Sequence, residues 1–212
     1  MLARASRFGS DSHRHADQGG FTIFAGGTAL ITPSGYFGRR YGTKHHLEWT
    51  NSTAAHNCLL IDGVGQPTYS MESRGSIVDF SEEEKRVTLD MSGAYPNITL
   101  WRREISLSDD TVTVKDSVKS DEPTEISYLL HSISEPKNDG NDVLIERGGK
   151  RLSVIPTEGG LTLESITDKF GVDLNEGEPK EYAVTMPTQY HITYKTERST
   201  SHELVVKYKI EQ

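Results

Sequence analysis

The fold is decided by two neighbouring runs of alternating residues, which read Thr99-Leu100-Trp101-Arg102-Arg103-Glu104-Ile105-Ser106 and Thr111-Val112-Thr113-Val114-Lys115-Asp116-Ser117-Val118. Apolar and polar side chains that alternate in this way are typical of strands with one buried face. The segment Ser108-Asp109-Asp110 between them is a turn signal. The two runs therefore predict an antiparallel β-hairpin.

Shorter runs of the same kind lie on both sides of this hairpin. We expect two strands within residues 21–37 around a Gly26-Gly27 turn, and further strands at residues 54–63, 76–80, 86–91, 125–133, 143–147, 151–155, 161–166, 182–186, 190–194 and 203–210. No window shows a helical period of apolar residues. The chain therefore predicts an all-β protein, a large antiparallel two-sheet β-sandwich that forms a single domain over residues 1–212.

Composition excludes several classes of protein. Hydrophobic residues make up 34% and charged residues 25% of the chain, and no apolar run approaches the roughly 20 residues that a spanning helix needs. The first residues lack the apolar core of a secretion signal, so we expect no membrane and a cytoplasmic location. The single cysteine, Cys58, excludes an internal disulfide and a cysteine-based zinc site, and its apolar neighbours favour a buried thiol.

Charge is unevenly distributed along the chain, whose net charge is −8. Residues 1–56 carry six basic and three acidic side chains, a net of +3, so the remaining residues carry −11. The N-terminal quarter is therefore the local positive region of an acidic protein, where a polyanion could bind. Nucleic acid is disfavoured, because the basic residues are few and no aromatic residues are interleaved with basic runs.

Histidines gather in the same quarter, since five of the eight (13, 15, 45, 46 and 56) lie in the first 56 residues. In a strand, His13, His15 and Asp17 would project from one face. Such a set can bind a divalent metal, or one histidine can act as a general base beside a ligand. The alternative is a pair of surface histidines beside the Gly19-Gly20 turn. Residues 38–53 form a long polar loop, and long loops in compact domains are often functional.

Several blocks together resemble the heparinase II/III-like C-terminal domain of polysaccharide lyases. The blocks lie within residues 6–67 and read Ser12-His13-Arg14-His15-Ala16-Asp17-Gln18, Pro33-Ser34-Gly35-Tyr36, Tyr41-Gly42-Thr43-Lys44-His45-His46, Ala55-His56-Asn57 and Ile61-Asp62-Gly63-Val64-Gly65-Gln66. The resemblance implies a β-sandwich that follows an N-terminal (α/α) toroid, with the active cleft between the two. This chain resembles the sandwich without the toroid.

The resemblance also implies a reaction, the β-elimination of a uronic-acid-containing polysaccharide. A base removes the C5 proton, the uronate carboxylate is neutralised, and an acid protonates the O4 leaving group. The expected ligand is an anionic uronate polysaccharide, such as a glycosaminoglycan or alginate. Because the toroid supplies part of the cleft, we expect the isolated chain to have little or no lyase activity.

Roles follow from the resemblance position by position. His13 is implied as a catalytic histidine, and Tyr41 as a tyrosine near the scissile bond, with packing under the loop as the alternative for Tyr41. Four further residues are implied as substrate-binding, namely Arg39, His45, His46 and Trp49. Trp49 would stack on a sugar ring if exposed, or pack in the core. The two arginines 39 and 40 would meet carboxylate or sulfate, or serve only as surface charges.

Zinc is the cofactor that the resemblance implies, with His15 and His56 as ligands. Zinc-binding relatives have an aspartate where this chain has Thr32, and a hydroxyl is a poor zinc ligand compared with a carboxylate. Three alternatives follow: Asp17 or Glu48 completes the site, the metal binds weakly, or no metal binds.

Two other functions were weighed against the lyase. One is a non-catalytic β-sandwich that binds carbohydrate or stabilises a partner. The other is a cupin-type metal enzyme, which is disfavoured because Asp17 follows the histidines where that pattern wants a glutamate. An uncovered cleft face would also favour a homodimer. We expect residues after about 70 to be scaffold, with His131 and His202 as packing or surface residues.

Overall fold

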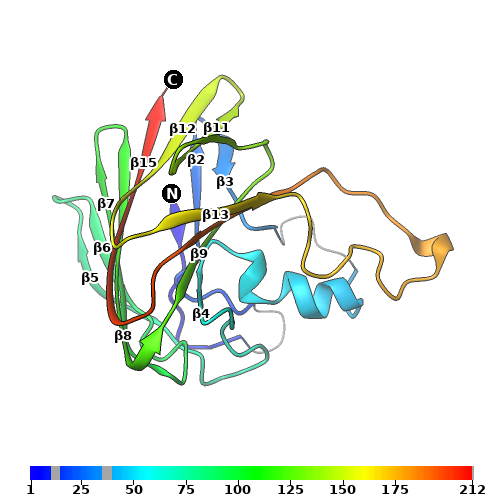
Figure 1. The fold of residues 1–212 in the computed structure, drawn as a ribbon, viewed down its shortest axis with the longest axis horizontal. Coiled ribbons are helices and arrows are strands. Elements are labelled where there is room, and N and C mark those ends of the chain that lie inside the picture. Colours follow the sequence, from blue (N-terminus) through cyan, green and yellow to red (C-terminus); the bar gives the residue numbers. More distant parts are fainter. Residues whose placement is uncertain (11–14, 35–39, 212) are drawn as a thin grey trace.

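The structure is a computed structural model that describes residues 1–10, 15–34 and 40–211. Its largest element is an eight-stranded antiparallel sheet. Its spatial order is β10-β11-β12-β15-β8-β7-β6-β5 (Figure 1). The strand bounds are β5 (Ser76–Ser81), β6 (Arg86–Asp90), β7 (Ile98–Ser108), β8 (Thr111–Thr124), β10 (Lys137–Asp139), β11 (Asp142–Arg147), β12 (Lys150–Glu158) and β15 (Ser199–Glu211). The predicted central hairpin is confirmed as β7 and β8, with the turn between them at Asp109.

Two smaller sheets form the opposite layer of the sandwich. One has the order β1-β2-β3, with β1 (Leu2–Ala3), β2 (Phe21–Ala25) and β3 (Thr28–Ile31). The other has the order β13-β14-β9-β4, with β13 (Thr162–Thr167), β14 (Tyr190–Lys195), β9 (Ile126–Ser132) and β4 (Leu59–Ile61). The Thr32 amide, just after β3, donates to the His131 carbonyl of β9 at 3.1 Å, so the two sheets adjoin. The predicted all-β sandwich is therefore confirmed, with one of its layers divided.

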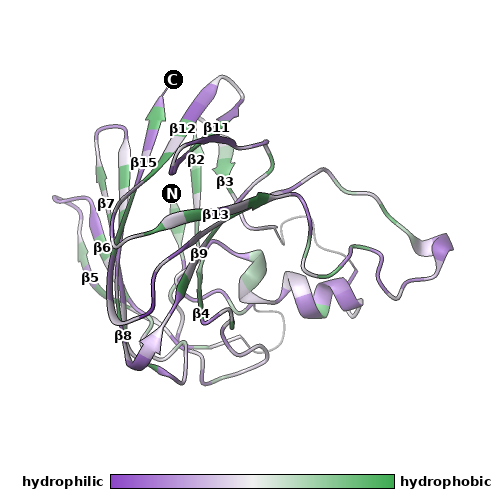
Figure 2. Cartoon of the chain, in the orientation of Figure 1, coloured by the Kyte–Doolittle hydropathy of each residue, from purple (hydrophilic) through white to green (hydrophobic). Residues whose placement is uncertain are grey.

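The core lies between the layers and is built from the buried apolar residues of the strands, whose ribbons carry hydrophobic positions among hydrophilic ones in Figure 2. Along β8 the buried side chains include Val112, Val114 and Val118, two or four residues apart, as the period of a strand requires. The layers also meet through polar atoms, because the Tyr128 and Tyr208 hydroxyls lie 2.8 Å apart. Burial of these faces is the main source of stability for such a fold.

A fully buried ion pair crosses the central hairpin. Arg103 and Asp116 are directly opposed in the β7–β8 register and neither side chain is exposed. Arg103 makes two parallel hydrogen bonds to the carboxylate, Nε to Oδ1 at 2.8 Å and Nη2 to Oδ2 at 2.7 Å. Its Nη1 donates to the Gly19 carbonyl, which ties the N-terminal segment to the core. The bidentate geometry offsets the cost of burying the two charges.

One predicted strand is wrong. Residues 182–186 are not in a sheet but lie in a long excursion of residues 168–189, hereafter the arm, which projects from the sandwich (Figure 1). Its one regular element is the short 3-10 helix η4 (Lys180–Tyr182). The alternating pattern misled because Tyr182, which is 58% exposed, meets no neighbouring strand. Pro179 and Pro187 flank the segment and cannot donate to a sheet.

The predicted loop at residues 38–53 is partly helical where it is described. A short π-helix, η2 (His46–Thr50), is followed by the 3-10 helix η3 (Thr53–Ala55). Across the described part of the chain, no helix is long and apolar enough to cross a membrane. The buried thiol is confirmed, because Cys58 is almost fully covered and burial raises its pKa to about 12.

Candidate functional site

Three separate segments bring histidines together at one end of the sandwich. The imidazole rings of His15 and His56 lie with their centroids 5.0 Å apart. His46, from η2, lies close enough that its charge lowers the pKa of His15. Two of these residues, His15 and His56, are the predicted zinc ligands. The structure thus brings that pair together although 41 positions separate them in the sequence.

A buried network of hydrogen bonds holds the segment that carries His15. The Thr53 hydroxyl donates to the Ala16 carbonyl at 2.7 Å and accepts from the Gln66 amide at 2.8 Å. Gln66 also clamps Gln18, since its Oε1 accepts from the Gln18 amide and its Nε2 donates to the Gln18 carbonyl, both at 2.8 Å. Sequence analysis missed this clamp, although both glutamines lie within the blocks that carry the family resemblance.

Burial fixes the protonation of His56. Its Nε2 lies 3.1 Å from the Thr50 carbonyl, and a carbonyl can only accept, so Nε2 carries the proton and Nδ1 holds the lone pair. Burial, together with the neighbouring His15, lowers the pKa of His56 to about 3. The pKa of His15 is also lowered, first by burial and then by the charges of Arg4 and His46. Both rings are therefore neutral near pH 7.

The described residues fit a metal ion only in part. The free Nδ1 of His56 has the orientation of a ligand whose other nitrogen is held by a backbone carbonyl, and it lies 4.0 Å from Asp17 Oδ2. Asp17 is however already paired with Arg4, which also donates to the His15 carbonyl at 3.0 Å. Over the described ranges, no group of three or more His, Cys, Asp or Glu side chains could hold a metal. Zinc therefore stays a prediction.

Tyr41 and His46 form the accessible part of the site. Tyr41 is 66% exposed, and its ring centroid lies 4.9 Å from that of His46. The Gly42 amide donates to His46 Nδ1 at 3.3 Å, which orients the imidazole. The other predicted catalytic residue, His13, and the predicted substrate-binding Arg39 lie outside the described residues.

Two of the residues predicted to contact substrate, Trp49 and His45, are buried. Trp49 is 7% exposed, and its indole Nε1 donates to the Ser34 hydroxyl at 3.0 Å. His45 donates from Nδ1 to the Val172 carbonyl at 2.8 Å and packs edge-on against Phe170. Both side chains therefore pack against residues of the arm, which covers the loop. For Trp49, the structure agrees with the alternative that this side chain packs in the core.

The arm, which sequence analysis assigned to scaffold with the other residues after about 70, lies against the loop that carries Tyr41 and His46. Lys44 forms an ion pair with Glu176, and Arg40 Nη2 lies 3.6 Å from Glu178 Oε2. The Arg40 guanidinium also lies over the Tyr182 ring, 6.0 Å from its centroid. The positive charges of the loop thus face acidic side chains that follow more than 130 residues later.

Two further histidines, His131 and His191, have ring centroids 5.0 Å apart, and His131 lies near His56. His131 donates to the Ala54 carbonyl at 3.0 Å, and its backbone amide donates to Asn57 Oδ1 at 2.8 Å. His191 is 5% exposed, lines a cavity of about 260 Å³, and has no hydrogen-bond partner on either ring nitrogen among the described residues. Burial lowers its pKa to about 4. His131 is buried, and His202, whose Nε2 lies 3.0 Å from the Thr124 carbonyl, is also a packing residue.

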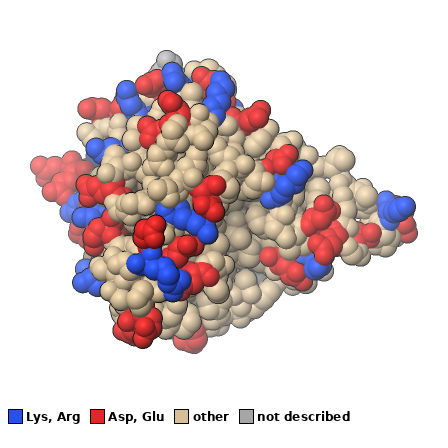
Figure 3. All heavy atoms as spheres, in the orientation of Figure 1, with Lys and Arg blue, Asp and Glu red and all other residues tan. Residues whose placement is uncertain are grey.

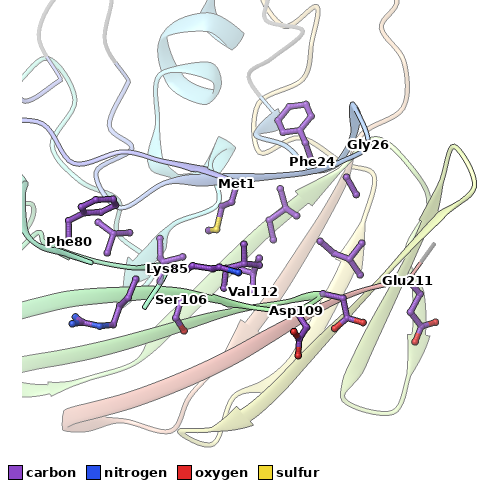
Figure 4. A pocket seen from close by; sticks show the side chains of 17 residues that line it. Met1, Phe24, Gly26, Phe80, Lys85, Ser106, Asp109, Val112 and Glu211 are labelled. Atoms are coloured by element: carbon purple, nitrogen blue, oxygen red, sulfur yellow. The ribbon is translucent and has the colours of Figure 1, made fainter. Parts of the chain in front are cut away.

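A groove that is larger than the cavities near the histidines lies elsewhere. It has a volume of about 830 Å³ and runs between Met1 and Phe24 on one side and Val112 and Ser106 on the other (Figure 4). None of the described candidate residues lines it. A smaller cavity of about 180 Å³ is lined by Arg4, Asp17 and His56. Size alone would therefore point away from the titratable residues, which are the better guide to chemistry.

Comparison with known proteins gives a consistent result. The family model described as "Heparinase II/III-like, C-terminal" matches residues 1–210. Among solved structures, heparan sulfate lyase HepC from Pedobacter heparinus is 15% identical, with a TM-score of 0.72, over 94% of this chain and 31% of that one. A structure titled heparinase III is 17% identical, with a TM-score of 0.71, over 98% of this chain and 31% of that one. No curated protein sequence matches this chain.

Proposed function

Because the chain belongs to the heparinase II/III-like C-terminal family of polysaccharide lyases, we propose that it is the β-sandwich of an enzyme that cleaves uronic-acid-containing polysaccharide by β-elimination. The observation that carries this proposal is the gathering of His15, His46, His56 and the exposed Tyr41 at one end of the sandwich. Neutral imidazoles beside an exposed phenol can move protons at a bound ligand.

The proposed reaction breaks the C5–H bond of the uronate and passes its electron pair into a new C4=C5 double bond. The C4–O4 bond then breaks, and O4 receives a proton. We assign the proton transfers to Tyr41, with His13 as the base or as the partner of the base. His46, in ring contact with Tyr41, would hold the phenol in place.

We propose that a second part of the site comes from outside this chain. The chain spans 31% of the length of the heparin and heparan lyase structures that it matches. We propose that an (α/α) toroid, on the same or another polypeptide, completes the cleft and that the isolated chain has little or no activity. A homodimer through the uncovered face stays a prediction.

The substrate would be an anionic polysaccharide, because β-elimination needs a carboxylate next to the C5 proton. A glycosaminoglycan is favoured by the relatives, which carry the names heparan sulfate lyase and heparinase III. Alginate is a second uronate polymer that the same chemistry would accept. The non-catalytic carbohydrate-binding alternative is weakened by the burial of Trp49, since it relied on that indole as a stacking platform.

Zinc is proposed at His15 and His56, with Asp17 as the nearest carboxylate. A bound zinc ion would order the two imidazoles and offset the charge of Asp17. The Glu48 alternative is less favoured, because Glu48 is an exposed residue of η2. No step of the proposed reaction depends on the metal.

The test is a fusion of this chain with the toroid part of heparinase III, assayed for the ultraviolet absorbance of an unsaturated uronate. We expect cleavage by the fusion and none by the isolated chain. Tyr41→Phe should lower kcat by roughly 10²–10⁴, the range for loss of a proton-transfer group, while Tyr190→Phe should leave it unchanged. Substantial cleavage by the isolated chain, or full activity of the Tyr41→Phe fusion, would contradict the proposal.

A further inference from the structure

The arm carries an acidic turn at residues 173–178, hereafter the acidic turn, which hydrogen bonds hold in a defined conformation. Asn175 connects the acidic turn to the C-terminal part of the arm. Its Nδ2 donates to the Val184 carbonyl at 3.0 Å and its Oδ1 accepts from the Val184 amide at 2.9 Å. Backbone bonds from Glu176 to Asp173 and from Glu178 to Asn175 close the turn itself. Both glutamates are therefore presented by a defined backbone.

This acidic turn lies against the loop that carries Tyr41 and His46. Glu176 pairs with Lys44 and Glu178 pairs with Arg40, the two described basic residues that flank Tyr41. The base of the arm is fixed to the sandwich, since Phe170 packs on Trp49 and His45 donates to the Val172 carbonyl. The acidic turn is thus held over the loop by a packed base and by two ion pairs.

The charge of the arm has the same sign as the proposed substrate. Residues 168–189 contain five acidic and two basic side chains, a net of −3, and acidic groups line the projection in Figure 3. An anionic polysaccharide that approached Tyr41 would need the same cations that Glu176 and Glu178 already hold. We propose that Glu176 and Glu178 are specificity-determining residues that compete with the anionic ligand for Lys44 and Arg40.

The ion pairs are of a kind that a ligand can displace. The Lys44 and Glu176 side chains are both more than 40% exposed. In the second pair Arg40 is 73% exposed and Glu178 is 12% exposed, so its cation is the side that a ligand can reach. Ion pairs at the surface are weak and are screened by salt. A polysaccharide with several neighbouring anionic groups engages both cations at once and so displaces the acidic turn, whereas a ligand with a single carboxylate does not. The acidic turn therefore sets the charge density that a ligand needs.

This inference rests on the proposed function only for the identity of the ligand, so its test uses a generic polyanion. Binding of a heparin oligosaccharide to the full chain would be measured at several salt concentrations. The double variant Glu176→Gln/Glu178→Gln should bind roughly threefold to tenfold more tightly than the unchanged chain at low salt. The gain should disappear when Lys44→Gln and Arg40→Gln are added.

The matched control is Glu82→Gln/Glu83→Gln, which removes the same charge from exposed positions in the β5–β6 turn. If this control gains as much affinity as the arm variant, only net charge matters and the inference is overturned. Unchanged binding by the arm variant overturns it as well. Neither result bears on the lyase reaction, which is tested separately by cleavage of a uronate polymer.

Discussion

Two polar regions of the molecule are built in opposite ways. In the sandwich, Arg103 and Asp116 are fully buried and joined by two parallel hydrogen bonds. At the arm, Glu176 and Lys44 form an ion pair in which both side chains are well exposed to solvent. The first arrangement is costly to break, because it would leave a buried charge without a partner. The second can open at little cost, so the sandwich fixes the histidines while the arm can respond to a ligand.

The largest effect is expected from breaking the buried pair. Arg103→Met leaves the Asp116 carboxylate buried and unpaired, and it should lower the free energy of unfolding by about 3–5 kcal/mol. Urea denaturation would measure the change. Arg102→Met is the matched control, because Arg102 is the exposed neighbour on the same strand. Equal losses in the two variants would refute the contrast between buried and exposed pairs.

The next effect concerns the glutamine clamp that holds His15. Gln66→Ala leaves the buried Gln18 amide without its partner and leaves the Gln18 carbonyl with only the Cys58 thiol, at 3.5 Å. The change should cost about 1–3 kcal/mol of unfolding free energy. Hydrogen exchange should also quicken at residues 15–20. The exposed Asn138→Ala serves as control. A loss of stability without faster exchange in that segment would mean that Gln66 does not position His15.

A third effect is a loss of stability in acid caused by the buried histidines. The folded pKa of His191 is lowered from 6.5 to about 4 by burial. The unfolded chain therefore binds this proton first, and folding stability falls as pH drops from about 6.5 towards 4. His191 should account for about 1–2 kcal/mol of the loss between pH 7 and pH 5. Urea denaturation of His191→Gln at both pH values should show a correspondingly smaller loss, and an unchanged pH dependence would contradict this assignment.

The smallest effect is expected at the arm. Glu176→Gln removes an exposed ion pair, so the urea midpoint of the chain should stay within experimental error of the unchanged protein. The same variant should nevertheless make residues 173–178 exchange amide hydrogens faster. A clear fall in the urea midpoint would show that the acidic turn is part of the stable fold rather than a displaceable contact.

The sandwich could be predicted because its signal is local. Alternation in β7 and β8 has the period of a strand, and the turn at Asp109 marks where the chain reverses. The same rule failed at residues 182–186, where alternation is present without a neighbouring strand to pair with. A strand pattern states which side chains could share a face, but the existence of a partner depends on the rest of the fold.

The site was harder to predict, because its contacts join distant parts of the chain. The pairing of His15 with His56 followed from resemblance to a family, and the structure brings the two rings together. Neither the burial of Trp49 nor the pairing of Lys44 with Glu176 has a local signal. Both depend on where the arm lies, which no pattern within residues 38–53 specifies.

The most direct test of the account is whether the isolated chain binds a uronate oligosaccharide at the histidine end of the sandwich. Titration would be followed by NMR of the histidine and tyrosine side chains, beside a ligand whose carboxylates have been reduced to alcohols. The account predicts perturbation of Tyr41, His46 and His15, and its loss with the reduced ligand. Equal binding of the two ligands, or perturbation only at the groove beside Phe24, would contradict it.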